Sequence, residues 1–212
     1  MTWIEQLVHE SAFTDESYQY LIGRGVTDSE ISQWELGFAN DKISQQYPNI
    51  TGKVLTPVRD GFGRLPFLMA RSLNGGSKYI TFPTGARKRW HLYGLEYAKQ
   101  SIIERNEAIL VEGQFDCILL HKIKYKNTIA LMGTPTTEQM LLLLCYTNRA
   151  LIVLDSDSGG DSFGRRVVKI GENIGMCIST VRCPQGKYKD PDEWARADPE
   201  SLHRAIIDQE KL

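Results

Sequence analysis

The feature that most constrains the fold is a regular alternation of short apolar runs and helix-like segments from residue 107 onward. The predicted strands are residues 108–111, 128–131, 150–154 and 177–182. The predicted helices are residues 115–122, 137–146, 161–174 and 199–209. Strands that alternate with helices at these lengths form a mainly parallel sheet with helices on both faces. The fold class is therefore α/β.

The first hundred residues have a different pattern. Residues 17–22 predict a helix, and a second short helix opens at Thr27, which has capping-box spacing to Glu30. The runs 53–59 and 65–71 predict a hairpin, because turn-forming residues separate them. We therefore expect a smaller, basic α+β domain ahead of the parallel sheet. The expected domains are residues 1–103 and residues 104–212.

Composition sets the broad class of protein. The chain has 212 residues, of which 42% are hydrophobic and 24% charged, as in an ordinary water-soluble globular protein. Its apolar runs are too short for a membrane span, and its N-terminus lacks the pattern of a signal peptide, so we expect a cytoplasmic protein with no membrane partner. The four cysteines form no Cys-x-x-Cys pair, which argues against structural zinc and favours buried or half-buried thiols in a reducing compartment.

Three acidic motifs carry the chemistry. Glu112 follows the first predicted strand of the parallel sheet, Asp155 and Asp157 follow the third, and Asp190 and Asp192 come later. The carboxyl ends of neighbouring parallel strands lie at one edge of a sheet, where ligands bind. Carboxylates gathered there repel each other unless divalent cations neutralise them. The pattern therefore predicts Mg²⁺ and phosphate chemistry.

Each motif also has an ordinary structural interpretation. Glu112 could be a solvated loop glutamate, and Asp157 or Asp161 could cap the helix that follows. Asp190 and Asp192 flank a proline ahead of a predicted helix, so an N-cap is an equal alternative there. His121 and His203 have no partner pattern, and we expect both on the surface.

Basic residues crowd the middle of the chain, ahead of the acidic motifs. They are Arg59, Arg64, Arg71, Lys78, Arg87, Lys88 and Arg89. A basic region beside an acidic cluster suits a polyanion held by side chains and processed at a metal. Trp90 directly follows the last of them and could stack on a base, although a solvated basic face is the common alternative.

These residues, in this order, resemble the TOPRIM domain, and almost the whole chain is similar to the polymerase core of the bacterial, DnaG-type DNA primases. The matching segments are Tyr20-Leu21-Ile22-Gly23-Arg24-Gly25-Val26, Val58-Arg59-Asp60-Gly61-Phe62-Gly63-Arg64, Glu112-Gly113-Gln114-Phe115-Asp116, Leu131-Met132-Gly133-Thr134 and Lys189-Asp190-Pro191-Asp192-Glu193. Ser156 departs from the family, which usually has glycine at this position.

The resemblance implies an enzyme that makes short RNA primers on single-stranded DNA from ribonucleoside triphosphates. Two or more Mg²⁺ or Mn²⁺ ions would be held by Glu112, Asp155, Asp157, Asp190 and Asp192, with Glu112, Asp155 and Asp157 as the catalytic set. Asp116 would stabilise Glu112 or the metal site without binding the metal directly. Phosphates of the template or the nucleotide would be bound by Arg24, Arg71, Lys78 and Lys88. Implied partners are a replicative helicase and a separate zinc-binding module.

No zinc-binding or helicase-binding segment flanks the matched region, so we expect those modules to be separate chains, as in a compact phage genome, or to have been removed. A TOPRIM nuclease is the main rival, because it shares the carboxylates but does not need the basic domain. A non-enzymatic DNA-binding TOPRIM protein is less favoured, since all three acidic motifs are intact. A type IA topoisomerase would need a much longer chain.

Overall fold

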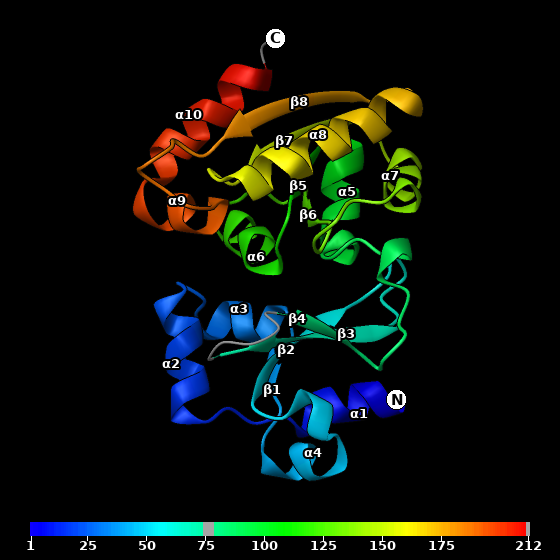
Figure 1. Ribbon diagram of the computed structural model, residues 1–212, viewed down its shortest axis with the longest axis vertical. Helices are drawn as coiled ribbons and strands as arrows, with labels where there is room; N and C mark the ends of the chain where they lie inside the picture. Colours follow the sequence, from blue (N-terminus) through cyan, green and yellow to red (C-terminus); the bar gives the residue numbers. More distant parts are fainter. Residues whose placement is uncertain (74–78, 211–212) are drawn as a thin grey trace. The chain divides into compact units, whose positions relative to one another are not determined.

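The computed structural model describes residues 1–73 and 79–210. The chain forms two compact units, Met1–Lys88 and Arg89–Leu212 (Figure 1). The domain boundary expected between residues 103 and 104 stays a prediction. None of the described helices is both long enough and apolar enough to cross a membrane.

The first unit is an antiparallel sheet with short helices. Its strands are β1 (Gly37–Phe38), β2 (Lys53–Val58), β3 (Phe67–Ser72) and β4 (Tyr79–Phe82), in the order β1-β2-β3-β4. Its α-helices are α1 (Trp3–Glu10), α2 (Asp15–Gly23), α3 (Asp28–Gln33) and α4 (Asp41–Gln46). The hairpin predicted over residues 53–71 is β2 and β3, paired with Leu55 opposite Ala70.

Local sequence explains where α3 begins. The N–H of Thr27 donates to Glu30 Oε2 at 2.9 Å, and the Thr27 hydroxyl donates to the same oxygen. These bonds hold the glutamate back over the first turn, as the capping-box spacing predicts. The helix that opens at Thr27 is therefore confirmed.

The second unit is a parallel α/β sheet. Its strands are β5 (Ala108–Val111), β6 (Thr128–Ala130), β7 (Arg149–Leu154) and β8 (Cys177–Arg182), in the order β6-β5-β7-β8, and every pairing is parallel. Its helices are α5 (Leu95–Arg105), α6 (Gln114–Lys122), α7 (Thr137–Leu144), α8 (Ser158–Asn173), α9 (Pro191–Ala197) and α10 (Pro199–Glu210). The predicted fold class is confirmed. Helix α5 was not predicted.

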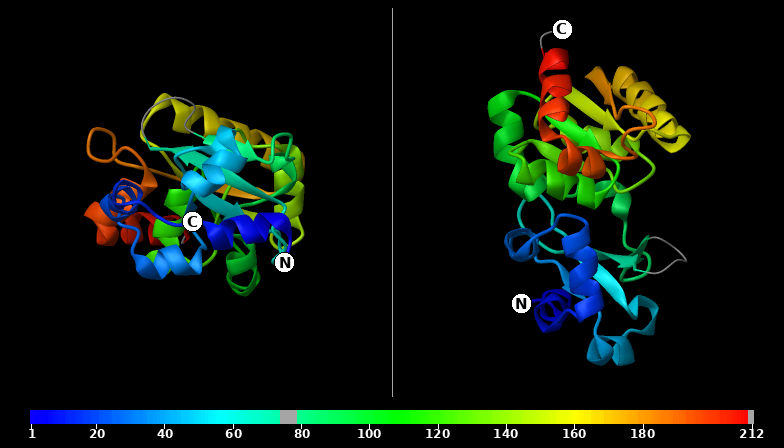
Figure 2. Two further views of the ribbon diagram at one scale, coloured as in Figure 1. Left: turned by 90° about the horizontal axis from the view of Figure 1, so that it is seen from below. Right: turned by 90° about the vertical axis from the view of Figure 1, so that its left-hand side faces the viewer.

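Helices cover both faces of this sheet, as Figure 2 shows. On one face, residues of α5, α7 and α8 share a core with Leu110 of β5 and Ile152 of β7. On the other face, α6 packs on β5 and β6 and also contacts α9. The alternation along β5 explains both layers, because Leu110 and its neighbour Ile109 are fully buried and point to opposite faces.

Two predictions about burial need correction. His121 is not a surface residue: it is only 1% exposed, because it lies on the face of α6 that packs on the sheet, and its Nε2–H donates to the carbonyl of Thr128 at 2.8 Å. His203 is exposed, as predicted. The prediction that all four thiols are buried or half-buried is correct for Cys117 and Cys183, which are buried. It is wrong for Cys145 and Cys177, which are exposed.

Burial of His121 gives the folded protein an acid sensitivity. Removal from water lowers the pKa of His121 to about 4, below the roughly 6.5 of an unfolded chain. The unfolded state therefore binds a proton first as the pH falls, and stability is lost between about pH 6.5 and pH 4, by up to about 3 kcal/mol.

We expect this loss in urea denaturation measured from pH 7 to pH 4. A His121→Gln variant is less stable at pH 7 but should lose less of its free energy of unfolding on acidification. The control is His9→Gln at an exposed position of α1, which should keep the wild-type loss of stability on acidification. If the free energy of unfolding depends equally on pH in wild type and His121→Gln, burial of His121 is not the cause of the acid sensitivity.

Candidate metal and nucleotide site

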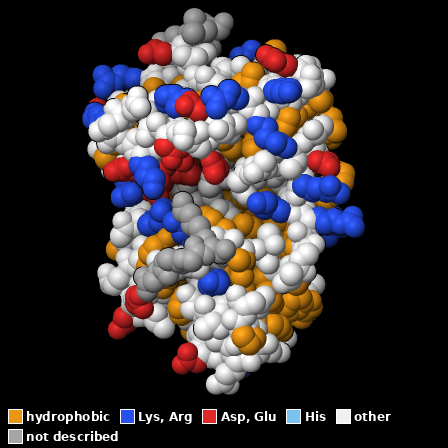
Figure 3. All heavy atoms as spheres, in the orientation of Figure 1, with side chains coloured by type: hydrophobic (Ala, Val, Ile, Leu, Met, Phe, Trp, Pro, Cys, Tyr) orange, Lys and Arg blue, Asp and Glu red, His pale blue; other side chains and the backbone are white. Residues whose placement is uncertain are grey.

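The acidic motifs meet at the carboxyl edge of the parallel sheet. Strands β5 and β7 are neighbours with Leu110 opposite Ile152, so Glu112 and Asp155 leave the sheet at the same edge. The third motif is tied to the second by Ser156, whose N–H donates to the carbonyl of Lys189 at 2.9 Å. The Ser156 hydroxyl donates to the same carbonyl at 3.2 Å. Figure 3 shows acidic side chains gathered on the second unit.

Asp116 is the buried centre of this region. Its Oδ2 accepts from the N–H of Gly113 at 3.1 Å, and its Oδ1 accepts from the N–H of Asp192 at 3.0 Å. Burial, and then the negative charges of Asp155, Asp190 and Asp192, raise the pKa of Asp116 well above its usual range. The structure therefore brings these four aspartates, which we call the aspartate cluster, into one electrostatic environment.

Two of the predicted ligands cap helices. Asp157 Oδ1 accepts from the N–H of Gly160 at 3.0 Å at the start of α8, and Asp190 Oδ1 accepts from the N–H of Glu193 at 2.9 Å at the start of α9. The capping alternatives are thus confirmed as contacts. Helix α8 begins at Ser158 and not at residue 161, because Asp157 is its N-cap. A carboxylate has two oxygens, so capping with one does not prevent the other from binding a cation.

Asp192 is the most deeply buried of the predicted ligands. It is 1% exposed, and its Oδ1 accepts from Arg196 Nε at 2.6 Å. Arg196 had not been assigned a role from the sequence, although it follows Asp192 at the four-residue spacing that brings helical side chains together. Breaking such a pair leaves a buried group without its partner, so Arg196 fixes the position of the Asp192 side chain.

Glu112 lines a pocket beside α8. It is half-buried and shares the lining with residues 133–135 and the first turns of that helix. Among the described residues, no three His, Cys, Asp or Glu side chains are arranged as they stand to hold a metal ion. The assignment of the acidic motifs as metal ligands stays a prediction.

The basic residues of the first unit are ordered by aromatic rings. The guanidinium of Arg71 lies 4.9 Å from the centre of the Tyr79 ring and 5.8 Å from that of Tyr20. The guanidinium of Arg24 lies 5.7 Å from the centre of the same Tyr20 ring, and its Nε donates to the Tyr20 hydroxyl at 3.1 Å. Tyr20 and Tyr79 had no assigned role in the sequence. The two arginines share the Tyr20 ring, so both are positioned before any anion arrives.

The remaining basic residues are less informative. Lys88 is half-buried in a short 3-10 helix, Lys88–Trp90, whereas Lys78 lies outside the described residues. Arg89 lies 5.5 Å from the centre of the Trp90 ring and 3.7 Å from Glu138. Trp90 is 48% exposed, so its ring is accessible for stacking.

Comparison with known proteins relates the second unit to a protein family. The Toprim-like family matches residues 109–195, the segment that carries all three acidic motifs. These residues therefore resemble a Toprim-like domain.

The chain as a whole resembles the catalytic core of the DNA primases. It is 30% identical over 193 residues to the DNA primase of Clostridium acetobutylicum, covering 89% of this chain and 32% of that protein. For the DNA primase of Rickettsia conorii the identity is 28%, covering 92% of this chain and 38% of that protein. The chain thus spans about a third of the length of the curated relatives it matches.

Solved structures agree on the fold. The E. coli primase catalytic core matches with a TM-score of 0.74 and 25% identity, covering 97% of this chain and 75% of that one. The Aquifex aeolicus primase, solved with its zinc-binding and RNA polymerase domains, matches with a TM-score of 0.86 and 24% identity, covering 97% of this chain and 59% of that one.

Close packing explains the glycine that follows the second acidic motif. A Cβ on Gly160 would lie 2.4 Å from the carbonyl oxygen of Asp155. Helix α8 can therefore start directly over the end of β7 only with glycine at this position.

We expect Gly160→Ala to lower the free energy of unfolding by roughly 1–3 kcal/mol, because the backbone must shift to admit the methyl group. Gly23→Ala is the matched control. A Cβ there meets nothing within 4 Å, so the change should be neutral or stabilising by up to about 1 kcal/mol. Urea denaturation of both variants measures the difference, and equal stability would contradict the packing argument.

Proposed function

We propose that this chain is the catalytic core of a DNA primase, which makes short RNA primers on single-stranded DNA from ribonucleoside triphosphates. The observation that carries the proposal is the set of carboxylates at the carboxyl edge of a Toprim-like sheet, at the ends of β5 and β7. The similarity to primase cores over nearly the whole chain supports it. A Toprim nuclease would share the carboxylates, so the tests below separate the two.

The carboxylates fit divalent cations. Aspartates that raise the pKa of buried Asp116 by their charge are stabilised when a cation neutralises them, and hard oxygen donors are those that Mg²⁺ and Mn²⁺ prefer. We assign as ligands of two or more such ions Glu112, Asp155, Asp157, Asp190 and Asp192. Asp116 does not bind the ions directly in this assignment but positions Asp192 through the backbone N–H of that residue. When bound, the ions neutralise the charge that develops on the phosphates during transfer.

The chain's own residues would act as follows. Glu112, Asp155 and Asp157 would hold the cations that bind the reacting phosphate at the sheet edge. Asp116 anchors the start of α9 through the N–H of Asp192. Arg24, Arg71, Lys78 and Lys88 bind phosphates of the template or the nucleotide, with Arg24 and Arg71 already placed by the Tyr20 ring. The 3′-hydroxyl of the nucleotide already paired to the template would attack the α-phosphate of the incoming triphosphate, and the bond to the β-phosphate would break to release pyrophosphate.

The partners follow from the same proposal. A replicative helicase and a zinc-binding module on another chain or segment would bring the template, and the reaction would take place in the cytoplasm. The similar Aquifex aeolicus primase was solved with a zinc-binding domain beside its RNA polymerase domain, which supports the need for such a module here.

Glu112→Gln should abolish RNA synthesis and leave the fold intact, because the amide keeps the shape but loses the negative charge. The assay uses single-stranded template, labelled ribonucleotides and Mg²⁺ or Mn²⁺. Glu172→Gln, the same change at an exposed position of α8, is the control and should retain activity. Wild-type rates in Glu112→Gln would overturn the assignment, and nicking of circular DNA without nucleotides would favour the nuclease.

Metal should stabilise the wild-type protein. A ligand that binds only the folded state at 100 times its dissociation constant adds about 2.7 kcal/mol, so saturating Mg²⁺ or Mn²⁺ should raise the melting temperature above that in chelator. Asp155→Asn should remove most of this shift, whereas Asp208→Asn on α10 should keep it. An unchanged shift in Asp155→Asn would contradict the ligand assignment.

A further inference from the structure

A pocket of about 510 Å³ lies beside Glu112 on the second unit. We call it the α8 pocket, because three cations of that helix line it: Arg165, Arg166 and Lys169. The loop that follows β6, residues 133–135, forms another part of the wall. These cations are distinct from the basic residues between positions 59 and 89, which precede the acidic motifs in the chain.

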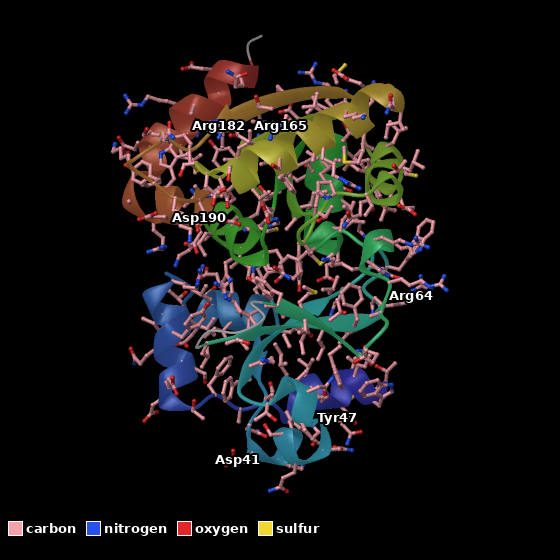
Figure 4. The ribbon with its side chains drawn as sticks, in the orientation of Figure 1. Asp41, Tyr47, Arg64, Arg165, Arg182 and Asp190 are labelled. Carbon is pink, nitrogen blue, oxygen red and sulfur yellow. The ribbon has the colours of Figure 1, made fainter. Side chains whose placement is uncertain are left out.

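The cations are arranged along the helix. Arg165 and Lys169 are four residues apart, so they lie on one face about 6 Å apart along the axis. Arg166 is fixed across the pocket, because its Nε donates to the carbonyl of Pro135 at 2.7 Å. All three side chains are exposed. Figure 4 labels Arg165 on α8.

The charge of the pocket is not balanced by the protein. Among the described residues, none of these three cations forms an ion pair, whereas Arg182 of the neighbouring strand pairs with Asp161 of the same helix. Glu112 is the one carboxylate among the described residues that line the pocket. Three positive charges against one negative charge attract an anion to this side of Glu112.

The pocket suits phosphates and not bases. Within the part of the chain that the structure describes, Phe163 is the one aromatic residue in the lining. It is 6% exposed, so its ring belongs to the core and not to a stacking surface. Arginine and lysine on an open surface bind phosphates without reading sequence. Successive phosphates of a strand are separated by a sugar, which suits cations one helical turn apart better than a triphosphate, whose phosphates share bridging oxygens.

We propose that the α8 pocket binds the backbone phosphates of a nucleic-acid strand whose reacting end lies at Glu112. The inference rests on the proposed function, to which it adds a second, sequence-independent contact on the Toprim-like domain itself. The strand would lie along α8, with Arg165 and Lys169 on successive phosphates and Arg166 nearest the loop after β6.

The test compares two double variants with equal charge change. Arg165→Ala/Lys169→Ala removes two pocket cations. Lys126→Ala/Arg204→Ala removes one lysine and one arginine that are also exposed but lie outside the pocket lining. Binding of a fluorescein-labelled single-stranded DNA is measured by anisotropy between about 50 and 200 mM salt, the range over which phosphate contacts weaken strongly.

We expect the pocket variant to bind at least tenfold more weakly at the lowest salt. The plot of log affinity against log salt should become shallower, with the magnitude of its slope smaller by about 1.4. Each phosphate contact on a single strand contributes about 0.7, and two contacts are removed. The control variant should keep both values. Affinity and slope equal to the control would overturn the proposal, and so would wild-type protein that binds no strand.

Two further measurements separate the alternatives. The KM for ribonucleotides should be unchanged in the pocket variant. A tenfold rise in this KM with intact DNA binding would overturn the proposal and show that the α8 pocket binds a triphosphate instead of a nucleic-acid strand. If wild-type protein makes no RNA but loses DNA affinity with the pocket cations, the proposed function fails while the pocket assignment holds. If wild type makes RNA and the pocket variant binds as tightly as the control, only the pocket assignment fails.

Discussion

The arrangement of the acidic region depends on the two hydrogen bonds that Asp116 accepts. One carboxylate oxygen holds the N–H of Gly113 at the start of α6, and the other holds the N–H of Asp192 in the first turn of α9. A single buried side chain therefore fixes the backbone of the first and third acidic motifs together. Its burial among other aspartates is electrostatically unfavourable, and this cost is what a bound cation would relieve.

Most of the parallel sheet could be predicted because its signals are local. Apolar runs such as residues 150–154 lie between turn-forming residues, and the Thr136 side chain caps α7 as its spacing to Gln139 suggests. Helix α5 was not predicted, although its buried residues Leu95, Ala98 and Ile102 follow the i, i+3, i+7 spacing of a helix face. Its apolar stripe is narrow, because these three are the residues of the helix that are buried.

The site was predictable in its residue types but not in its contacts. The motif order located Glu112 and Asp155 at one sheet edge, as the pairing of β5 with β7 now places them. The pairing of Arg196 with Asp192 and the ordering of Arg71 by Tyr20 and Tyr79 were not foreseen. Tyr20 is distant from Arg71 in the chain, and Tyr79 lies opposite Arg71 only once β3 and β4 pair in register. The Arg196 spacing is common to many surface pairs.

The bond between Asp116 and Asp192 joins residues that are 76 positions apart. During synthesis, α6 and the first two acidic motifs leave the ribosome well before Asp192 does. Until then Asp116 lacks one of its two backbone donors, and α9 is not in place against α6. The acidic region is therefore completed only once the chain has been synthesised beyond Asp192, and until then its carboxylates lack the backbone contact that joins the first and third motifs.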